Sequence, residues 1–187
     1  MILLARHGET ADNADPSRVM GHRDPPLSSL GREQAAAMAE DMATRGIAAL
    51  HTSHLRRALE TAEFVATRIG IEPTVDPRLA EARMGEWEGQ LKRDLERERP
   101  EQWAAWRRGG AGFRFPGGES LPELQERVLA ALAEVRAGPL PALVICHGGS
   151  IRAAFAHASP RGLDSFHELG DVANVAVLTL PEPVDIP

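Results

Sequence analysis

Two histidines in this sequence each follow a short apolar run and directly precede a glycine. His7 comes after residues 1–5 and Arg6, and His147 comes after residues 142–146. Apolar runs of this length are typical of buried strands, and the carboxyl ends of parallel strands meet at one edge of a sheet. We therefore expect both imidazoles at the same edge, although a histidine that follows a strand is, when it stands alone, more often structural than catalytic.

Two arginines accompany these histidines. Arg6 precedes His7, and Arg57 lies in the first turn of a predicted helix, where the free N–H groups favour an anion. A planar guanidinium binds phosphate oxygens bidentately. Cations packed around His7 would lower the pKa of its imidazole, and the neutral imidazole is the nucleophilic form. The cluster therefore predicts a phosphate site with a nucleophilic histidine, although either arginine could be an ordinary surface residue.

The chain between these residues alternates between strand-like and helix-like patterns. Strands are predicted over 1–5, 47–50, 142–146 and 175–180, and helices over 28–46, 53–70, 120–138 and from Ser150 onward. Residues 92–108 are expected to form helical pieces within a variable, lid-like segment over 90–118. This alternation favours an α/β fold, a three-layer α/β/α sandwich with a largely parallel central sheet.

Length and composition narrow the class of protein. The 187 residues suit one domain over 1–187, with 43% apolar residues for its core and a loose tail over 181–187. A net charge of −6 argues against nucleic acid or an anionic membrane as the partner, and no apolar run approaches the ~20 residues that span a bilayer. A single cysteine excludes an internal disulfide framework. We expect a soluble, cytoplasmic monomer or homodimer.

Short motifs occur in order along nearly the whole chain. They are RHGET at 6–10 followed by Asn13, GHRDPPLSSLGREQA at 21–35, SHLRRALETA at 53–62, LAEARMGEWEG at 79–89, GGES at 117–120 and VICHGGSIR at 144–152. Together these motifs resemble the histidine phosphatase superfamily, also called phosphoglycerate mutase-like. The resemblance implies a phosphoglycerate mutase-like sandwich and a metal-independent phosphomonoesterase without a cofactor, acting on a small phosphorylated metabolite.

The resemblance also implies a role for each residue that matches a motif. The catalytic residues would be His7 as the phosphorylated nucleophile, Glu81 as proton donor and later base, and His147; the substrate-binding residues would be Arg6, Asn13, Arg57 and the backbone N–H of Gly148. Cleavage of a phosphate ester needs a proton for the leaving alkoxide, which is typically worth roughly 10²–10⁴-fold. The choice of Glu81 over Glu86 and Glu88 depends on the motif alone.

Three other functions fit parts of the sequence. Residues 146–152 read CHGGSIR, which fits the C-x-x-G-x-x-R loop of cysteine-dependent phosphatases, but Ala153 follows where Ser or Thr is usual, and Cys146 is more simply a buried strand residue. A cofactor-dependent phosphoglycerate mutase shares the phosphate site, although EARMGEWEG is more similar to the phosphatase branch. A non-catalytic phosphate-binding or scaffold domain is disfavoured because His7, Glu81 and His147 are all intact.

No pattern in the sequence identifies the part of the substrate beyond its phosphate. Several cations could bind a second acidic group, although such charges are more often a solvated surface: Arg83, Lys92, Arg107, Arg108 and Arg114. Trp87, Trp103 and Trp106 could stack on the ring of α-ribazole phosphate or a sugar phosphate, although tryptophans at helical spacing usually belong to a core.

Metal ligation has little support in the sequence. His51 and His54 have a metal-like spacing, but a turn that enters a helix explains them more simply. The chain has no Walker-type GxxxxGK[ST] run and no cluster of aspartates. We therefore expect no metal site.

Overall fold

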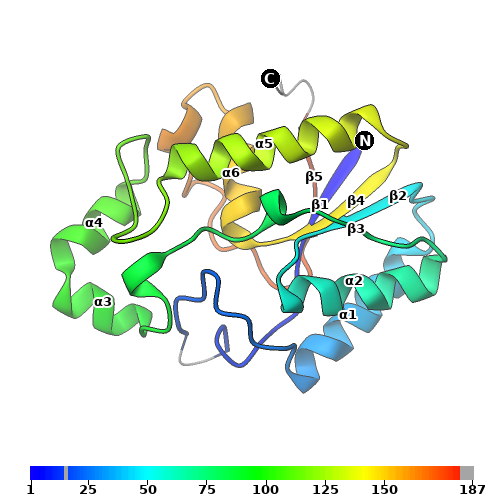
Figure 1. The fold of residues 1–187 in the computed structure, drawn as a ribbon, viewed down its shortest axis with the longest axis horizontal. Coiled ribbons are helices and arrows are strands. Elements are labelled where there is room, and N and C mark those ends of the chain that lie inside the picture. Colours follow the sequence, from blue (N-terminus) through cyan, green and yellow to red (C-terminus); the bar gives the residue numbers. More distant parts are fainter. Residues whose placement is uncertain (15–16, 182–187) are drawn as a thin grey trace.

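The computed structural model describes residues 1–14 and 17–181, so the predicted tail lies, apart from Pro181, outside the described residues. A sheet in the order β3-β2-β4-β1-β5 runs through the centre of the molecule (Figure 1). The strands are β1 Ile2–Arg6, β2 Ala49–Thr52, β3 Thr74–Val75, β4 Ala142–Cys146 and β5 Val177–Thr179. β5 is antiparallel to β1 and the other pairs are parallel. The largely parallel sheet is confirmed.

Helices cover both faces of the sheet. They are α1 Ser29–Met42, α2 Arg56–Ile69, α3 Lys92–Glu98, α4 Pro100–Arg108, α5 Leu121–Ala137 and α6 Gly148–Ala158. α1 and α2 cover one face, and α5 and α6 cover the other (Figure 1). The strands alternate accordingly: Leu3 and Ala5 of β1 face the core under α1 and α2, whereas Ile2 and Leu4 face the core under α5 and α6. This confirms the three-layer sandwich.

Capping residues explain where several helices begin and end. Ser28 caps α1 by accepting a hydrogen bond from the Gly31 N–H, and Ser120 forms the predicted capping box with Glu123. Gly70 ends α2 in the left-handed conformation, with φ of 72°.

Some predicted boundaries were wrong. α1 ends at Met42 rather than near Gly46, and the N-cap position of α2 is Leu55, which makes no side-chain capping bond, rather than Ser53. β2 lies two residues beyond the predicted 47–50. α6 begins at Gly148 rather than Ser150, so His147 itself is the N-cap residue. This earlier start places the positive end of the helix directly beside the two histidines.

Residues 90–118 form α3, α4 and the turn that follows. The two helices lie beyond the carboxyl ends of β1 and β4 (Figure 1). An aromatic cluster contacts α4: the ring centroids of Trp106 and Phe115 are 5.0 Å apart at a tilt of 46°, and those of Trp103 and Trp87 are 6.0 Å apart. Trp87 is buried, as expected for a core tryptophan. Among the described residues, no helix has the length and apolarity needed to cross a membrane.

Candidate active site

β1 delivers His7 to the edge of the sheet in a defined tautomer. The His7 N–H donates to the Cys146 carbonyl at 3.1 Å and extends the β1–β4 ladder by one residue. The ring Nδ1 lies 2.7 Å from the Gly8 carbonyl, and Arg57 Nε donates to Nε2 at 3.1 Å. The hydrogen-bond network therefore assigns the proton to Nδ1 and leaves the Nε2 lone pair as an acceptor. Burial and the cations Arg57 and Arg6 lower the pKa of His7 well below 6.5, so the ring is neutral.

Arg57 is fully buried at the N-terminus of α2 and donates in three directions. Besides Nε to His7, one terminal nitrogen donates to the Arg23 carbonyl at 2.7 Å and the other to the Gly21 carbonyl at 3.0 Å. Burial lowers the pKa of Arg57 to about 10, which leaves it a cation at neutral pH. The glycine- and proline-rich loop after Asn13 thus supplies the carbonyls that orient the guanidinium beside His7.

Arg6 and Asn13 lie on the open side of His7. Arg6 donates to the Val172 carbonyl, while its Nε is buried without a hydrogen-bond partner among the described residues. Asn13 accepts from the Thr10 N–H at 2.6 Å through Oδ1 and donates to Asn174 Oδ1 at 3.0 Å through Nδ2. Both side chains line the main cavity.

His147 faces His7 from the end of β4. The two ring centroids are 5.1 Å apart at an angle of 55°. His147 is fully buried, and neither ring nitrogen has a hydrogen-bond partner within the described part of the chain. Burial and nearby Arg57 lower its pKa well below 6.5. Because a buried polar group without a partner is costly, this ring is suited to bind a group of the substrate.

Glu81 lies in the loop between the short 3-10 helices Pro77–Leu79 and Gly85–Trp87. Its Oε2 accepts from the Gly149 N–H of α6 at 3.2 Å, and Oε1 accepts from the Ala82 N–H at 2.9 Å. The side chain lines the cavity. Glu88 instead accepts from the Met84 N–H, and Glu86 pairs with Arg99 on the surface. The geometry therefore separates Glu81 from its two neighbouring glutamates.

A cavity of about 720 Å³ opens above these residues. Four of the predicted site residues line it: Arg6, Asn13, Glu81 and Gly148. His7, Arg57 and His147 are 1%, 0% and 0% exposed and are not among the residues that line it. The structure thus brings the predicted residues together at the carboxyl ends of β1 and β4, four of them in the cavity lining and three of them buried.

The same cavity extends to part of the variable segment. Trp103 and Trp106 form its aromatic wall, and Lys92 and Arg107 contribute positive charge. The other three predicted cations do not line it: Arg83 pairs with Glu119, Arg114 pairs with Glu123, and Arg108 lines a separate surface hollow. The structure therefore separates two candidate substrate-facing cations from three that lie elsewhere.

Sequence reasoning missed two residues that hold the His7 segment. Asn174 Nδ2 donates to the His7 carbonyl at 3.0 Å, and Thr61 Oγ1 accepts from the Gly8 N–H at 3.1 Å. Thr61 could have been found, because it lies one helical turn after Arg57 and so on the same face of α2. Asn174 lies in an irregular loop before β5, and nothing in its local sequence signals the contact.

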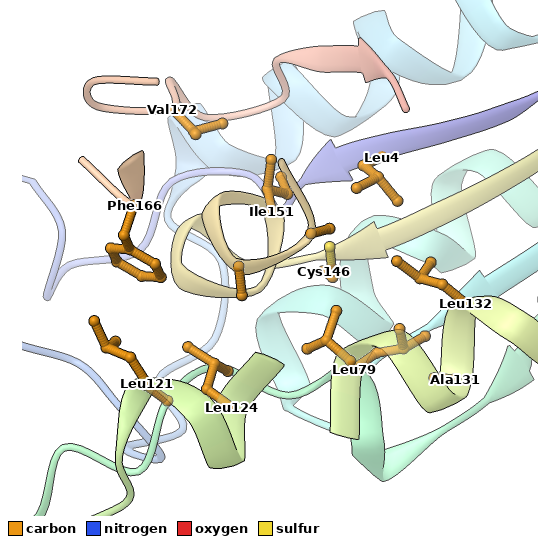
Figure 2. Close-up of a cluster of buried hydrophobic side chains, with 14 of the residues drawn as sticks. Leu4, Leu79, Leu121, Leu124, Ala131, Leu132, Cys146, Ile151, Phe166 and Val172 are labelled. Carbon is orange, nitrogen blue, oxygen red and sulfur yellow. The ribbon is translucent and has the colours of Figure 1, made fainter. Parts of the chain in front are cut away.

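The structure contradicts a nucleophilic role for Cys146. Figure 2 shows its side chain among Leu4, Leu132 and Ile151 in the core between the sheet and the helices α5 and α6. Burial raises the pKa of the thiol to about 12, so the thiolate is scarce at neutral pH.

For metals, the described residues contain no group of three or more His, Cys, Asp or Glu side chains arranged to hold an ion.

Comparisons with known proteins agree with this geometry. The profile of the histidine phosphatase superfamily (branch 1) matches residues 2–182. The glucosyl-3-phosphoglycerate phosphatase of Mycolicibacterium vanbaalenii is 34% identical over 96% of this chain and 83% of its own length. The protein named "Probable phosphoglycerate mutase GpmB" of Yersinia enterocolitica is 39% identical over 79% of this chain and 69% of its own length.

A solved structure extends the similarity to three dimensions. The mycobacterial glucosyl-3-phosphoglycerate phosphatase in complex with VO3 superimposes with a TM-score of 0.84 at 33% identity, over 94% of this chain and 88% of that one. Sequence profile, relatives and fold agree over nearly the whole chain. It follows that this chain belongs to the histidine phosphatase superfamily, branch 1.

Proposed function

We propose that this phosphoric monoester hydrolase acts on a small phosphorylated metabolite through a phosphohistidine formed on His7. The observation that carries the proposal is the neutral His7 ring, whose Nδ1 is bonded to the Gly8 carbonyl and whose Nε2 lone pair accepts from Arg57. A neutral imidazole held beside a guanidinium combines a nucleophile with a binder of phosphate oxygens.

In the first step, His7 Nε2 attacks phosphorus and the P–O bond to the leaving alcohol breaks. Arg57 Nε donates to the lone pair that must attack, at 3.1 Å. The entering phosphate must therefore take over this N–H, which places the guanidinium on an equatorial oxygen. Two donors bind the remaining charge: Arg6, whose Nε has no hydrogen-bond partner among the described residues, and the N–H of Gly148 at the start of α6. Glu81 gives its proton to the leaving oxygen.

In the second step, water hydrolyses the phosphohistidine. Glu81 removes a proton from the water, which attacks phosphorus as the P–N bond breaks, and His7 is released neutral with free phosphate. Glu81 is placed for both steps because its side chain lines the cavity, where two backbone N–H groups fix the position of the carboxylate. The same residue therefore acts as acid and then as base.

For the substrate, we propose a phosphate ester with a ring or sugar beside the phosphate. Half-buried Trp103 and Trp106 line the cavity beyond Glu81, and rings of this kind stack on sugars and heterocycles. The relative from Mycolicibacterium is named for a glucosyl compound. Residues 90–118 would then contribute the wall that selects the substrate.

A substrate panel tests the proposed function. Wild-type protein and a His7→Ala variant are assayed on p-nitrophenyl phosphate and on sugar phosphates from acidic to neutral pH, with and without a chelator. We expect wild-type turnover that the chelator leaves unchanged, and none from His7→Ala. Labelled phosphate should appear on wild-type protein quenched during turnover and be absent from the variant. Activity lost with the chelator, or kept without His7, would contradict the proposal.

A cofactor-dependent phosphoglycerate mutase is the weaker alternative. Its support is the similarity to the Yersinia protein that carries this name. A mutase returns the phosphoryl group to a second hydroxyl before water takes it. Conversion of 3- to 2-phosphoglycerate with the bisphosphate primer, at a rate above hydrolysis, would favour the mutase.

We also propose one domain over 1–187, a cytoplasmic location, and a monomer or homodimer without nucleic-acid partners. The net charge of −6 supports the absence of a nucleic-acid role. The family profile, which spans residues 2–182, supports the single domain.

A further inference from the structure

One guanidinium from α5 donates hydrogen bonds to the loop that carries Glu81. Arg127, in the first half of α5, donates to the carbonyls of Arg78 and Ala80 at 2.7 Å each through one terminal nitrogen. Its other terminal nitrogen donates to the Glu81 carbonyl at 2.8 Å. Three carbonyls within four residues thus converge on a single side chain.

Glu119 fixes that guanidinium from the other side. Its carboxylate accepts from Arg127 at 2.6 Å and 3.1 Å, and its side chain is 0% exposed. Glu119 also binds the far end of the same loop: Oε1 accepts from the Arg83 N–H at 3.0 Å, and the Glu119 N–H donates to the Arg83 carbonyl at 2.9 Å. Arg127 and Glu119 therefore hold residues 78–83 by hydrogen bonds on both sides of Glu81.

This set of hydrogen bonds requires an arginine. The guanidinium has a fixed planar fork of N–H donors, and here Nε and both terminal nitrogens are all engaged. A lysine ammonium is a single point and cannot reach three carbonyls and two carboxylate oxygens together. Two other side chains also contact this backbone: Ser150 Oγ donates to the Ala80 carbonyl at 2.8 Å, and His22 Nε2 lies 2.8 Å from the Glu81 carbonyl.

We propose that Arg127, held by Glu119, is a positioning residue for proton transfer by Glu81. It fixes the backbone from which the carboxylate reaches the start of α6, and so sets where the proton is delivered. This inference rests on the proposed role of Glu81 as proton donor. The ion pair between Arg127 of α5 and Glu119 of the GGES motif would then affect the chemical step as well as folding.

The dependence of rate on the leaving group separates positioning from a structural role. A good leaving group such as p-nitrophenol needs little protonation, whereas phenol or methoxyphenol depends on the acid. Loss of the acid or of its position should therefore steepen the fall of kcat/KM across a series of substituted phenyl phosphates. A variant that merely contains less folded protein loses the same factor on every substrate.

The experiment compares Arg127→Gln, Glu119→Gln and Glu81→Gln with Arg78→Gln as the matched control. Arg78 belongs to the same segment, but among the described residues its guanidinium binds only the carboxylates of Asp76 and Glu134. We expect Arg127→Gln and Glu119→Gln to lose up to about 10²-fold in kcat/KM on methoxyphenyl phosphate, as a misplacement of about 1 Å can cause, with a much smaller loss on p-nitrophenyl phosphate. Arg78→Gln should keep the wild-type slope.

Each outcome decides between the inference and the proposed function. If Glu81→Gln steepens the series and both Arg127→Gln and Glu119→Gln keep the wild-type slope, the positioning role is wrong while the proposed function stands. If Glu81→Gln itself keeps the slope in an enzyme that still requires His7, the acid is misassigned and the inference fails with it. Should Arg127→Gln not fold, Glu119→Gln decides, because it keeps the shape of the buried side chain. Full activity of Arg127→Lys would also overturn the inference.

Discussion

The carboxylate of Glu81 lies in the space that a β-carbon at position 149 would fill. An ideal Cβ on Gly149 would fall 2.1 Å from Glu81 Oε1, closer than real atoms approach. The Gly149 N–H meanwhile donates to Oε2 at 3.2 Å. α6 and Glu81 therefore fit together only because residue 149 has no side chain, and this requirement comes from close approach rather than from a positive φ.

Gly149→Ala should reduce activity without reducing stability. Alanine favours a helix over glycine by about 1 kcal/mol, whereas its methyl group must displace the Glu81 carboxylate. We expect a loss of about 10²-fold in kcat/KM, because a displaced catalytic group costs this much. Steady-state kinetics and urea unfolding measure the two effects. Gly112→Ala, whose Cβ would meet nothing within 4 Å, is the control; equal activity of both variants would contradict the close fit.

Arg57→Lys should lose both activity and stability. The three acceptors on His7, Gly21 and Arg23 each bond a different nitrogen of the planar guanidinium, and an ammonium concentrates its N–H groups on one nitrogen, so buried acceptors lose their donors at a cost of about 1–3 kcal/mol. Loss of one preorganised donor to the phosphate should reduce kcat by about 10²–10³-fold. Arg56→Lys is the neighbouring control, because the Arg56 side chain is exposed and pairs with Glu60. A wild-type kcat for Arg57→Lys would remove this guanidinium from the proposed mechanism.

Local signals allowed much of the fold to be predicted. The capping box of Ser120 with Glu123 and the left-handed stop at Gly70 are set by a few adjacent residues, so the sequence displays them. β3 was missed because it has only two residues, both exposed, and its existence depends on pairing with β2. The start of α6 was misplaced because Gly148 and Gly149 are poor helix formers, although the close approach of Glu81 requires a glycine at position 149.

The candidate site was predictable where a motif carried each residue, and not where chain topology did. His7, Glu81 and His147 were chosen from motifs that the family profile spans. Asn174 comes within 3.0 Å of the His7 carbonyl across a sequence separation of 167 residues, through a loop without periodicity. The Arg127 contacts likewise connect α5 with backbone carbonyl oxygens. Every residue has such an oxygen, so the residue types in the sequence do not indicate the contact. Long-range contacts to backbone are therefore the part that sequence reasoning cannot supply.

Stability should fall as the pH drops from about 6.5 to 5. His7 and His147 have pKa values lowered well below 6.5 by burial and by neighbouring arginines, whereas in the unfolded chain they titrate near 6.5. Below that pH the unfolded state binds protons that the folded state does not. The free energy of unfolding should therefore decrease by up to about 1.4 kcal/mol per pH unit for each histidine. Urea titrations of wild type and a His7→Gln/His147→Gln variant measure the slope, which should be shallower in the variant; equal slopes would contradict neutral buried imidazoles.

Cys146→Ala should leave turnover almost unchanged. The thiol lies in the core beside Leu4 and Ile151 (Figure 2), Cys146 does not line the cavity, and burial raises the pKa of the thiol to about 12. A buried sulfur removed from this core should lower the free energy of unfolding, by about 1 kcal/mol, because the atoms around it lose their contacts. In the native protein, iodoacetamide should fail to label this cysteine at neutral pH, whereas the urea-unfolded chain should react. The cysteine-dependent mechanism requires a thiolate at the phosphate. If Cys146→Ala lost activity while His7→Ala stayed active, the nucleophile would be the sulfur of Cys146 and not the imidazole of His7.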